Sequence, residues 1–467
     1  MSLQCLICIF LCFQGTWSYS IRVSDTNSNY SYDFTDQYED LFQYEDGILR
    51  DRLKSFVEGQ GYKFEKIPVT TDDGYILELH HLYQGTSKIP VLIMPGLLSS
   101  SAVVLITGKN RALAMRLVDQ GYDVWICNPR GSTYSRKHKT LDPDKDKQKF
   151  WDFSFHELGY YDTPATMDYI LNHTNASTLT YIGISQGTSQ FFAMASARPE
   201  YNSKIDIMMA MGPVAFMSHV RVPLLHFLKH HIVLIEWLQK KFQVYEVYPR
   251  YGTIAANIFC RDGSMFQWVC KLLLSLLLGF DLNKFDSKLL PVILESLPSS
   301  ASFKQLQHYL QEVQSGHFNQ YDYGVIKNLE IYNQTSPPDY DIAKISCPVA
   351  LMYGKHDRLA VPKDIEKLTN KLPNVVEEYK IEKPTFSHVD FMFAKDNDAL
   401  INFPVINILN KYHGLPLITT PAPTTIAPIT RPSSTKRPTS GLRTTEGPYT
   451  MAPITRRPST KKANLRT

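Results

Sequence analysis

The sequence predicts an α/β domain with a mostly parallel central sheet and a helical insertion. Three observations indicate this fold class. Short apolar runs alternate with helix-length stretches, which is typical of βαβ units. The pentapeptide Gly183–Gly187 stands between a strand-like run, Leu179–Ile182, and a helix-like run, Ser189–Arg198. Residues 215–324 then interrupt the alternation with helical and irregular segments that carry little strand signal.

The N-terminus is typical of a secretory signal. Residues 3–13 form an apolar core, and the small residues Ser18 and Ser20 follow it. The core is too short to span a bilayer, so we predict a cleaved signal peptide over residues 1–20 rather than an anchor. A secreted protein is therefore expected, with a lysosomal location as the alternative.

An acidic leader is predicted over residues 21–54. Residues 23–49 hold seven Asp/Glu and no Lys or Arg, with Tyr38 and Tyr44 among the acids. A solvated leader is the favoured interpretation, because charge runs are usually solvated. Tyrosine sulfation and docking of a basic segment are the alternatives.

The main domain is predicted over residues 55–414, a length that suits one large domain or a domain with a cap. Its candidate strands are mostly apolar throughout, as expected for strands that are covered on both faces of a parallel sheet. The runs are Val91–Met94, Tyr122–Cys127, Leu179–Ile182, Ile205–Met211, Val349–Tyr353 and Val375–Ile381.

The pentapeptide Gly183–Gly187 is a candidate nucleophile elbow. In a G-x-S-x-G turn between a strand and a helix, the serine hydroxyl points out of the sheet, and the glycines let strand and helix approach closely. We therefore predict Ser185 as a nucleophile. A Gly/Ser turn without chemistry is the alternative, and the flanking strand and helix patterns favour the elbow.

A serine nucleophile requires a histidine base and a carboxylate that orients the base. In α/β hydrolases these two groups follow the serine in the order Asp or Glu, then His, at the ends of strands. Asp357 and His388 each come just after a predicted strand. We predict the triad Ser185, Asp357 and His388. Asp390 is a weaker alternative for the acid, and His356 is expected to face solvent.

The tetrahedral intermediate requires an oxyanion hole. One donor should be the backbone N–H after the nucleophile, which is that of Gln186. The other should come from the loop after the third strand, which makes the Leu97 N–H the candidate. A plain turn at Pro95-Gly96 is the alternative interpretation of this loop.

The interrupting segment, residues 215–324, is interpreted as a helical cap (lid) over the site. It contains the helical pattern Leu224–Phe242 and the very apolar run Leu272–Leu278. Neither offers 18 uninterrupted apolar residues, so neither is a good transmembrane helix. Ordinary core helices are the alternative for each helix taken singly.

Four of the seven cysteines lie beyond the signal segment. Cys260 and Cys270 are close in sequence and form the candidate disulfide, while Cys127 and Cys347 are expected to be buried thiols. Four N-x-S/T sequons predict a glycoprotein, and their acceptors are Asn29, Asn172, Asn175 and Asn333.

The C-terminal segment, residues 415–467, is rich in Thr, Pro and Ser and is predicted to be disordered and mucin-like. Residues 418–467 hold nine Lys/Arg and one acid, a net charge of +8, whereas the whole chain is +4 and residues 1–417 therefore carry −4. The acidic main part argues against nucleic-acid binding. Contact with a mucous or matrix layer is one role that this composition suggests for the tail, and unchanged retention after deletion of residues 415–467 would contradict it.

In combination, several motifs resemble the animal acid lipases, the family of gastric lipase and lysosomal acid lipase. The resemblance covers about residues 55–412, and Thr71–Leu77 matches the opening strand of the family. The matching stretches are Thr71–Leu77, Pro95–Leu98, Gly121–Trp125, Asn128–Gly131, Phe153–Glu157, Tyr161–Ala165, Gly183–Thr188, Asp357 and Ser387–Phe391.

The resemblance implies an α/β-hydrolase fold with a helical cap and hydrolysis of carboxylic esters in neutral lipids, triacylglycerols or steryl esters. It implies the same triad and oxyanion donors as the residues above. The cap cysteine pair of the family is similar to Cys260 and Cys270, with a spacing one residue longer here. The chemistry requires no cofactor, and the sequence shows no metal cluster or phosphate loop.

Three positions depart from the family pattern. Pro95 and Ile184 stand where the family has histidines, and Cys127 stands where it has glycine. All three triad residues and both donor positions are retained. Because Pro95 and Ile184 replace polar groups expected near the site, we expect a difference in substrate preference.

The sequence therefore predicts a secreted serine ester hydrolase that acts on lipid esters at an interface and contacts the lipid surface through its cap. A shorter-chain carboxylesterase and a catalytically weak lipid-binding homologue are the alternatives. The complete triad favours an enzyme, and the long apolar insertion favours lipid.

Overall fold

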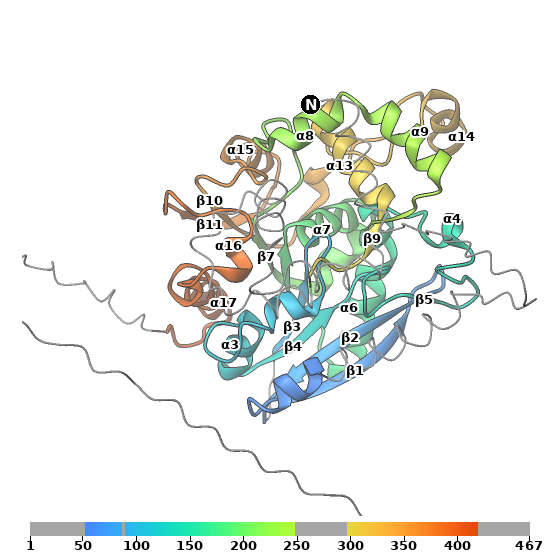
Figure 1. Cartoon of the computed structure of the whole chain (residues 1–467). Coiled ribbons are helices and arrows are strands. Elements are labelled where there is room, and N and C mark those ends of the chain that lie inside the picture. Colours follow the sequence, from blue (N-terminus) through green and yellow to red (C-terminus); the bar gives the residue numbers. More distant parts are fainter. Residues whose placement is uncertain (1–51, 86–88, 248–296, 419–467) are drawn as a thin grey trace, which may run out of the picture. The chain divides into compact units, whose positions relative to one another are not determined.

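Nine strands form one sheet within residues 52–85, 89–247 and 297–418, the parts of the chain that the computed structural model describes (Figure 1). Their spatial order is β1-β2-β4-β3-β6-β7-β10-β11, and β5 pairs with β2. Neighbours from β4 to β11 run parallel, whereas β1, β2 and β5 pair antiparallel. The bounds are β1 Lys63–Thr70, β2 Tyr75–Tyr83, β3 Ile89–Met94, β4 Tyr122–Cys127, β5 Lys137–His138, β6 Leu179–Ile184, β7 Ile205–Met211, β10 Val349–Gly354 and β11 Val375–Ile381.

This mostly parallel sheet confirms the predicted fold class, and all six predicted strands are present. Every residue of β4 and β6 is buried, because helices cover both faces of the sheet there. By contrast, β11 alternates exposed and partly buried residues, as expected for an edge strand with one solvated face.

The segment Thr71–Leu77, which resembles the opening strand of the family, is a strand only from Tyr75 onward. The segment contains the turn of the β1–β2 hairpin and only the first residues of β2. Gly74 has φ +98°, a value that favours glycine, and the Thr71 N–H donates to the Tyr75 carbonyl at 2.9 Å. The apolar runs in the sequence did not indicate β1, which contains Pro68. Proline is tolerated there because β1 is an edge strand.

Helices cover the two faces of the sheet and complete two apolar cores. One core contains residues of α6 and α7, and the other contains residues of α3 and α17. The helix bounds are α3 Leu113–Asp119, α4 Lys147–Phe150, α5 Phe155–Glu157, α6 Thr163–Thr174, α7 Gln186–Ala197, α15 Pro362–Thr369, α16 Asp390–Phe393 and α17 Phe403–His413. Short 3-10 or π turns lie at Ser101–Val104, Leu158–Asp162, Pro199–Lys204, Ile342–Lys344 and Asp398–Asn402.

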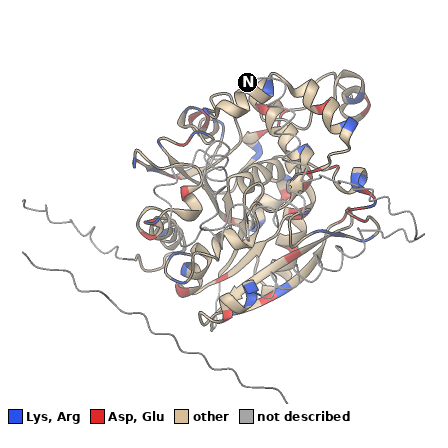
Figure 2. Cartoon of the chain, viewed as in Figure 1, with Lys and Arg blue, Asp and Glu red and all other residues tan. Residues whose placement is uncertain are grey.

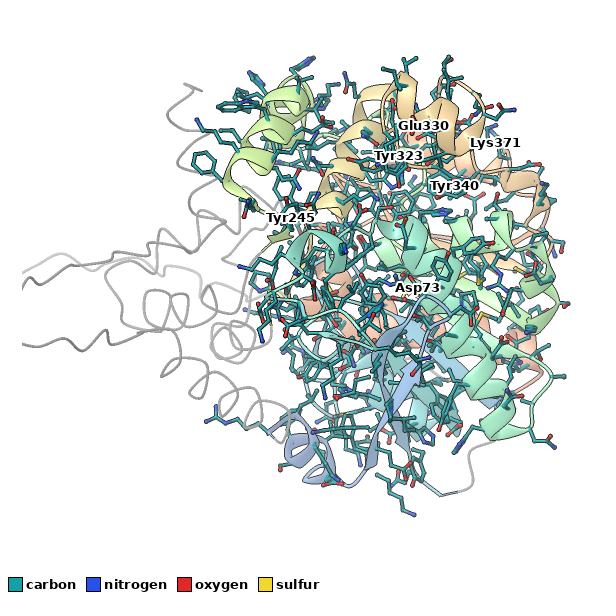
Figure 3. The ribbon with its side chains drawn as sticks, turned by 90° about the vertical axis from the view of Figure 1, so that its right-hand side faces the viewer. Asp73, Tyr245, Tyr323, Glu330, Tyr340 and Lys371 are labelled. Carbon is teal, nitrogen blue, oxygen red and sulfur yellow. The ribbon has the colours of Figure 1, made fainter. Side chains whose placement is uncertain are left out.

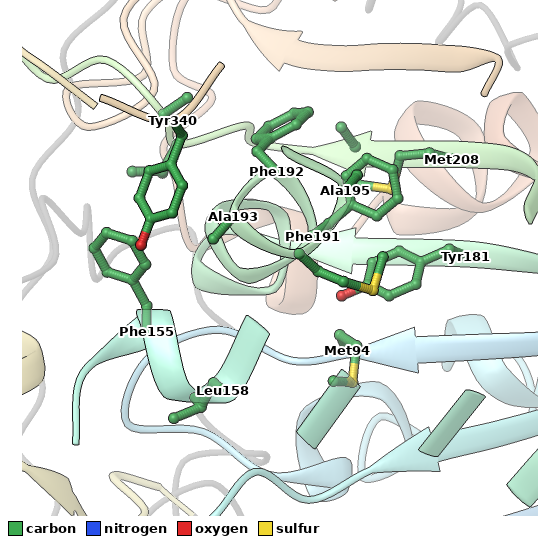
Figure 4. Close-up of a cluster of buried hydrophobic side chains, with 14 of the residues drawn as sticks. Met94, Phe155, Leu158, Tyr181, Phe191, Phe192, Ala193, Ala195, Met208 and Tyr340 are labelled. Atoms are coloured by element: carbon green, nitrogen blue, oxygen red, sulfur yellow. The ribbon is translucent and has the colours of Figure 1, made fainter. Parts of the chain in front are cut away.

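Alternate residues of each strand enter opposite cores. On β3, Met94 lies in the α7 core, whereas its neighbour Ile93 lies in the other core. Figure 4 shows the α7 core, with Phe191 and Phe192 of α7 between the strands and Tyr340. This packing holds the amino end of α7 against the carboxyl ends of β3 and β6.

The described part of the predicted cap lies over one end of the sheet, as Figure 1 shows. Its elements, together with the helix that follows, are α8 Pro223–Lys229, α9 Ile232–Phe242, β8 Glu246–Val247, β9 Ala301–Ser302, α13 Phe303–Ser315 and α14 Val325–Tyr332. A small apolar cluster, which includes Ile235, Leu238 and Phe303, joins α9 to α13. No helix among the described residues is long and apolar enough to cross a membrane.

Several predictions fall outside the described residues: the signal peptide, most of the leader, Asn29, the Leu272–Leu278 run, the Cys260–Cys270 pair and most of the tail. Of the rest, Cys127 and Cys347 are buried free thiols, as predicted. The three sequon residues Asn172, Asn175 and Asn333 are exposed. Figure 2 shows acidic and basic residues interspersed along the ribbon of the described domain.

Contacts with the domain continue at both ends beyond the boundaries that the sequence predicts. Leu53, within the predicted leader, is buried in the α3–α17 core. At the other end, the Ile418 N–H donates to Asn407 Oδ1 at 2.7 Å, inside the predicted tail.

Candidate active site

Ser185 lies at a strained turn between β6 and α7. Its backbone has φ 54° and ψ −115°, a conformation that a residue with a side chain rarely adopts. Backbone bonds hold the turn: the Ser185 N–H donates to the Met211 carbonyl at 2.9 Å, and the Thr188 N–H donates to the Ser185 carbonyl at 2.8 Å. This is the geometry of a nucleophile elbow.

The two glycines of the pentapeptide are required by close packing. A Cβ atom on Gly187 would lie 2.1 Å from the Met94 carbonyl oxygen, and one on Gly183 would lie 2.8 Å from the Gly187 backbone. Real Cβ atoms do not approach backbone so closely, so any larger residue would push α7 away from β3 and β6. The glycines thus allow the tight strand–turn–helix geometry that the sequence pattern predicts.

The structure brings the three predicted triad residues together. Ser185 Oγ lies 2.7 Å from His388 Nε2, and His388 Nδ1 lies 2.7 Å from Asp357 Oδ2. Asp357 is fully buried, and its other oxygen accepts the backbone N–H groups of Leu359 at 2.8 Å and Ala360 at 3.1 Å. The carboxylate is therefore held on both oxygens, and it can orient the imidazole.

Loops after β10 and β11 carry Asp357 and His388, and small residues let these loops approach the elbow. A Cβ atom on Gly354 would lie 2.6 Å from the Phe386 ring, beside the loop of His388. Gly212 has φ +58°, and a Cβ there would lie 3.0 Å from His388 Cε1. Glycine at both positions therefore allows the histidine to reach Ser185.

The alternatives to the triad residues have other roles. Asp390 Oδ2 accepts the N–H and the Oγ–H of Ser387 at 2.6 and 2.8 Å, so this carboxylate stabilises the turn before His388. His356 is exposed, as the sequence predicts. Asp357 is thus the carboxylate that lies against the histidine ring.

The structure contains a second serine–histidine–carboxylate contact, which no pattern in the sequence predicted. Ser101 Oγ lies 2.7 Å from His80 Nδ1, and His80 Nε2 lies 2.8 Å from Glu78 Oε1. Ser101 and His80 are both fully buried, so no substrate can reach this hydroxyl. The contact joins β2 to the loop after β3 and is structural.

The predicted oxyanion loop lies beside the nucleophile. A Cβ atom on Gly96 would lie 3.2 Å from Ser185 Cβ. Among the described residues, the next N–H along the chain, that of Leu97, donates no hydrogen bond. Gln186 is the first residue of α7, so its N–H precedes the hydrogen-bond ladder of the helix. Both N–H groups are therefore suited to an incoming oxyanion.

The expected effect of Ile184 on substrate preference stays a prediction, and the structure shows where this side chain lies. The Ile184 side chain is buried in the core with Ile182, Met209 and Met211, on the α3–α17 side of the sheet. Strand alternation directs it there, because Ile184 is two residues after Ile182 on β6. Ile184 therefore affects the site through packing, not by replacing a polar group that a substrate would touch.

Polar side chains join α7 to α13 beneath the cap, and the sequence had not indicated them. Gln186 Nε2 donates to Gln305 Oε1 at 2.7 Å, and the Tyr309 hydroxyl donates to Ser189 Oγ at 2.9 Å. On α13, Glu312 lies seven residues after Gln305 and three after Tyr309, so the three side chains share one helix face.

Glu312 is a buried carboxyl without a partner. Neither of its oxygens forms a hydrogen bond within the described residues. Burial raises the pKa of the Glu312 carboxyl well above its usual range, because an unpaired charge is costly in apolar surroundings. The carboxyl therefore stays protonated to a higher pH in the folded protein than in the unfolded chain.

Replacement of Glu312 by glutamine should stabilise the protein at neutral pH and change little at pH 4. An unfolded glutamate ionises above about pH 4.5, so wild-type stability falls by about 1.4 kcal/mol per pH unit from there to the pKa of the folded state. Glutamine carries no proton to lose. Melting temperatures of Glu312→Gln and wild type should therefore diverge as the pH rises from 4 to 8.

The matched control is Glu330→Gln on the exposed surface of α14. In Figure 3, Glu330 lies near the top of the molecule and Tyr340 lies below it. The control should melt in parallel with wild type at every pH. A constant gap between Glu312→Gln and wild type across this range would contradict the assignment of a buried, protonated Glu312.

The sequence matches two known protein families. Residues 89–246 match the family described as alpha/beta hydrolase fold, and residues 53–108 match the family described as partial alpha/beta-hydrolase lipase region. The second match covers the β1–β2 hairpin, β3 and the predicted oxyanion loop.

Three curated proteins are similar over most of the chain. Lipase 1 of Drosophila melanogaster is 36% identical over 357 residues, which cover 75% of this chain and 78% of the fly protein. Gastric triacylglycerol lipase of Homo sapiens is 33% identical over 361 residues, which cover 75% and 89%. Lipase member K of Homo sapiens is 34% identical over 370 residues, which cover 77% and 91%.

Proposed function

Because this chain belongs to the acid lipase family of α/β hydrolases and is an ester hydrolase of neutral lipids, we propose that Ser185, His388 and Asp357 catalyse the hydrolysis through an acyl-enzyme. The observation that carries the proposal is the unbroken hydrogen-bond chain from a strained serine to a fully buried carboxylate. A serine with a purely structural role would not be expected to combine a strained backbone with hydrogen bonds that lead through a histidine to a carboxylate.

In the acylation step, Ser185 Oγ attacks the ester carbonyl carbon while His388 Nε2 takes the hydroxyl proton. Asp357 accepts the Nδ1–H of the imidazole, so Nε2 is free to act as the base. The carbonyl oxygen gains the negative charge and accepts the N–H groups of Leu97 and Gln186. The C–O bond to the alcohol then breaks, and the imidazolium returns its proton to the leaving oxygen.

Deacylation repeats the same steps with water as the nucleophile. His388 takes a proton from the water, the water oxygen attacks the acyl carbon, and the proton returns to Ser185 Oγ as the fatty acid leaves. No group other than these side chains and backbone N–H groups is needed, so the proposal involves no cofactor.

We propose triacylglycerols or steryl esters as the substrates. Large apolar side chains on the cap support contact with a lipid surface: on α9, Val233 is 77% exposed and Trp237 is 53% exposed. Lys241 Nζ lies 4.6 Å from the Trp237 ring, which combines an aromatic group and a basic group as interfacial helices do. Further exposed apolar residues on α14 are Val325, Ile326, Leu329 and Ile331.

Labelling with a biotinylated fluorophosphonate tests the nucleophile. The purified protein should react, and mass spectrometry should find the phosphonate on the peptide that contains Ser185. Ser101→Ala should label like wild type, because Ser101 is fully buried. An adduct on another serine, or no adduct on active protein, would contradict the proposed nucleophile.

A chain-length series separates a lipase from a shorter-chain carboxylesterase. If lipid esters are the substrates, kcat/KM should rise from butyrate to oleate esters when the long esters are presented as an emulsion. A maximum at butyrate, with no turnover of emulsified triolein or cholesteryl oleate, would favour the carboxylesterase.

Secretion and glycosylation are further proposals. They draw on the predicted signal peptide and on exposed sequon residues at Asn172, Asn175 and Asn333. Sensitivity of the secreted chain to an N-glycosidase, followed by mass spectrometry of the three peptides, would test them together.

A further inference from the structure

The segment that leaves the cap contacts both sides of the predicted oxyanion hole. The Ser299 N–H donates to the Leu98 carbonyl at 2.8 Å, next to the candidate donor Leu97. Farther along the same segment, Gln305 accepts the side-chain bond from Gln186, the other candidate donor residue, at 2.7 Å. Residues 299–305, which we call the cap root, therefore link the loop after β3 to the start of α7, two segments that are far apart in the sequence.

The Gln186–Gln305 bond is shielded from water. Both side chains are only 2% exposed. Gln186 Oε1 has no partner among the described residues, so Gln305 is the one hydrogen-bond partner that this part of the chain offers to the Gln186 amide. A buried amide without a partner costs about 1–3 kcal/mol. Gln186 is therefore expected to move if Gln305 is removed.

The other contact of the cap root bears on the Leu97–Leu98 turn. Leu98 has φ 56°, which is uncommon for a non-glycine residue and requires support from its surroundings. Its side chain packs against the cap cluster that contains Ile235 and Leu238. Leu98 is thus held by the cap through its side chain and by Ser299 through its carbonyl.

The cap root is itself anchored to the domain. The Ser302 hydroxyl donates to the Trp151 carbonyl at 2.7 Å, and Lys304 Nζ lies 2.8 Å from Asp152 Oδ1. These bonds attach the start of α13 to the loop before α5. Because the cap root is fixed to the domain, its contacts can hold the two candidate donor residues, Leu97 and Gln186, in place.

We propose that Gln305 is a positioning residue, which holds the backbone N–H of Gln186 in line with that of Leu97 and so couples the cap to the oxyanion hole. This inference rests on the proposed function. Gln305 touches no reacting atom and acts only through Gln186. Because donor geometry matters most when charge develops on the oxygen, its effect falls on the transition state rather than on substrate binding.

Gln305→Leu removes the acceptor at nearly constant volume and tests the proposal. On a soluble short-chain ester, kcat should fall about 10- to 100-fold, the scale of a donor misplaced by about 1 Å, while KM should change less than about twofold. The Ki of a trifluoromethyl ketone, whose adduct with the serine carries an oxyanion, should rise by the same factor as kcat falls.

Gln311→Leu is the matched control, because Gln311 is on the same helix and its Nε2 donates to the Asp322 carbonyl at 2.9 Å, away from α7. It should retain wild-type kcat. The double variant Gln186→Leu/Gln305→Leu should be no slower than Gln186→Leu alone, since the two side chains act through one bond. A melting temperature close to that of wild type shows that Gln305→Leu is folded.

Two results would overturn the proposal: wild-type kcat and Ki in folded Gln305→Leu, or equal losses in Gln305→Leu and Gln311→Leu. Failure of the proposed function would appear elsewhere, as hydrolysis at close to the wild-type rate in Ser185→Ala. The two failures are therefore distinguishable in one set of variants.

Discussion

Ser185→Ala should lower kcat for ester hydrolysis about 10⁶-fold, the scale on which serine hydrolases lose activity when the nucleophile is removed. Alanine cannot form the acyl-enzyme, and His388 then has no hydroxyl to deprotonate. Residual hydrolysis above the water rate should persist, because the oxyanion donors are intact. Initial rates on a chromogenic ester, measured with enough enzyme to detect a 10⁶-fold loss, provide the check.

Ser101→Ala is the control for this experiment. The Ser101 hydroxyl lies 2.7 Å from His80, the same distance that separates the Ser185 hydroxyl from His388. The variant therefore removes a similar hydrogen bond from a buried contact outside the proposed site. It should keep kcat within about twofold and lose about 1–3 kcal/mol of stability, because the buried hydrogen bond between Ser101 and His80 is removed. Comparable loss of activity in the two variants would argue against Ser185 as the nucleophile.

Asp357→Asn should lower kcat about 10⁴-fold, as the same change does in other serine triads. The amide of asparagine can donate to His388 Nδ1, so the imidazole would carry its proton on Nε2, and that nitrogen could no longer accept the proton of Ser185. Labelling by a fluorophosphonate should slow in parallel. Steady-state rates together with the second-order labelling constant measure both effects.

Asp390→Asn separates the two carboxylates near His388. Asparagine Oδ1 can still accept the Ser387 N–H, so the turn is retained and kcat should fall less than about tenfold. If Asp390→Asn proved slower than Asp357→Asn, the acid would have to be reassigned to Asp390. The short Asp357–His388 distance, 2.7 Å, is the reason for expecting the opposite order.

Local sequence patterns predicted much of the fold and the residues of the candidate site. Strands buried almost entirely on both faces, such as β4 and β7, are apolar apart from one aspartate each and were found to the residue. The elbow was found because its glycines, its serine and the flanking elements are contiguous. The β1 strand was missed because Pro68 interrupts it, and its edge position, which makes the proline tolerable, is a property of the assembled sheet.

By itself, the sequence determined the fold class, the family, and the identity of the candidate nucleophile, base, acid and oxyanion loop. These follow from short-range chemistry: apolar periodicity, glycines beside a serine, and the chain order of three residue types. Only the tertiary structure decided which of two serine–histidine contacts is fully buried, which carboxylate lies against His388, that Ile184 lies in the core, and that Gln305 lies on Gln186. The reason is physical, because each of these depends on the direction of side chains from elements that meet only when the sheet and the cap are packed together.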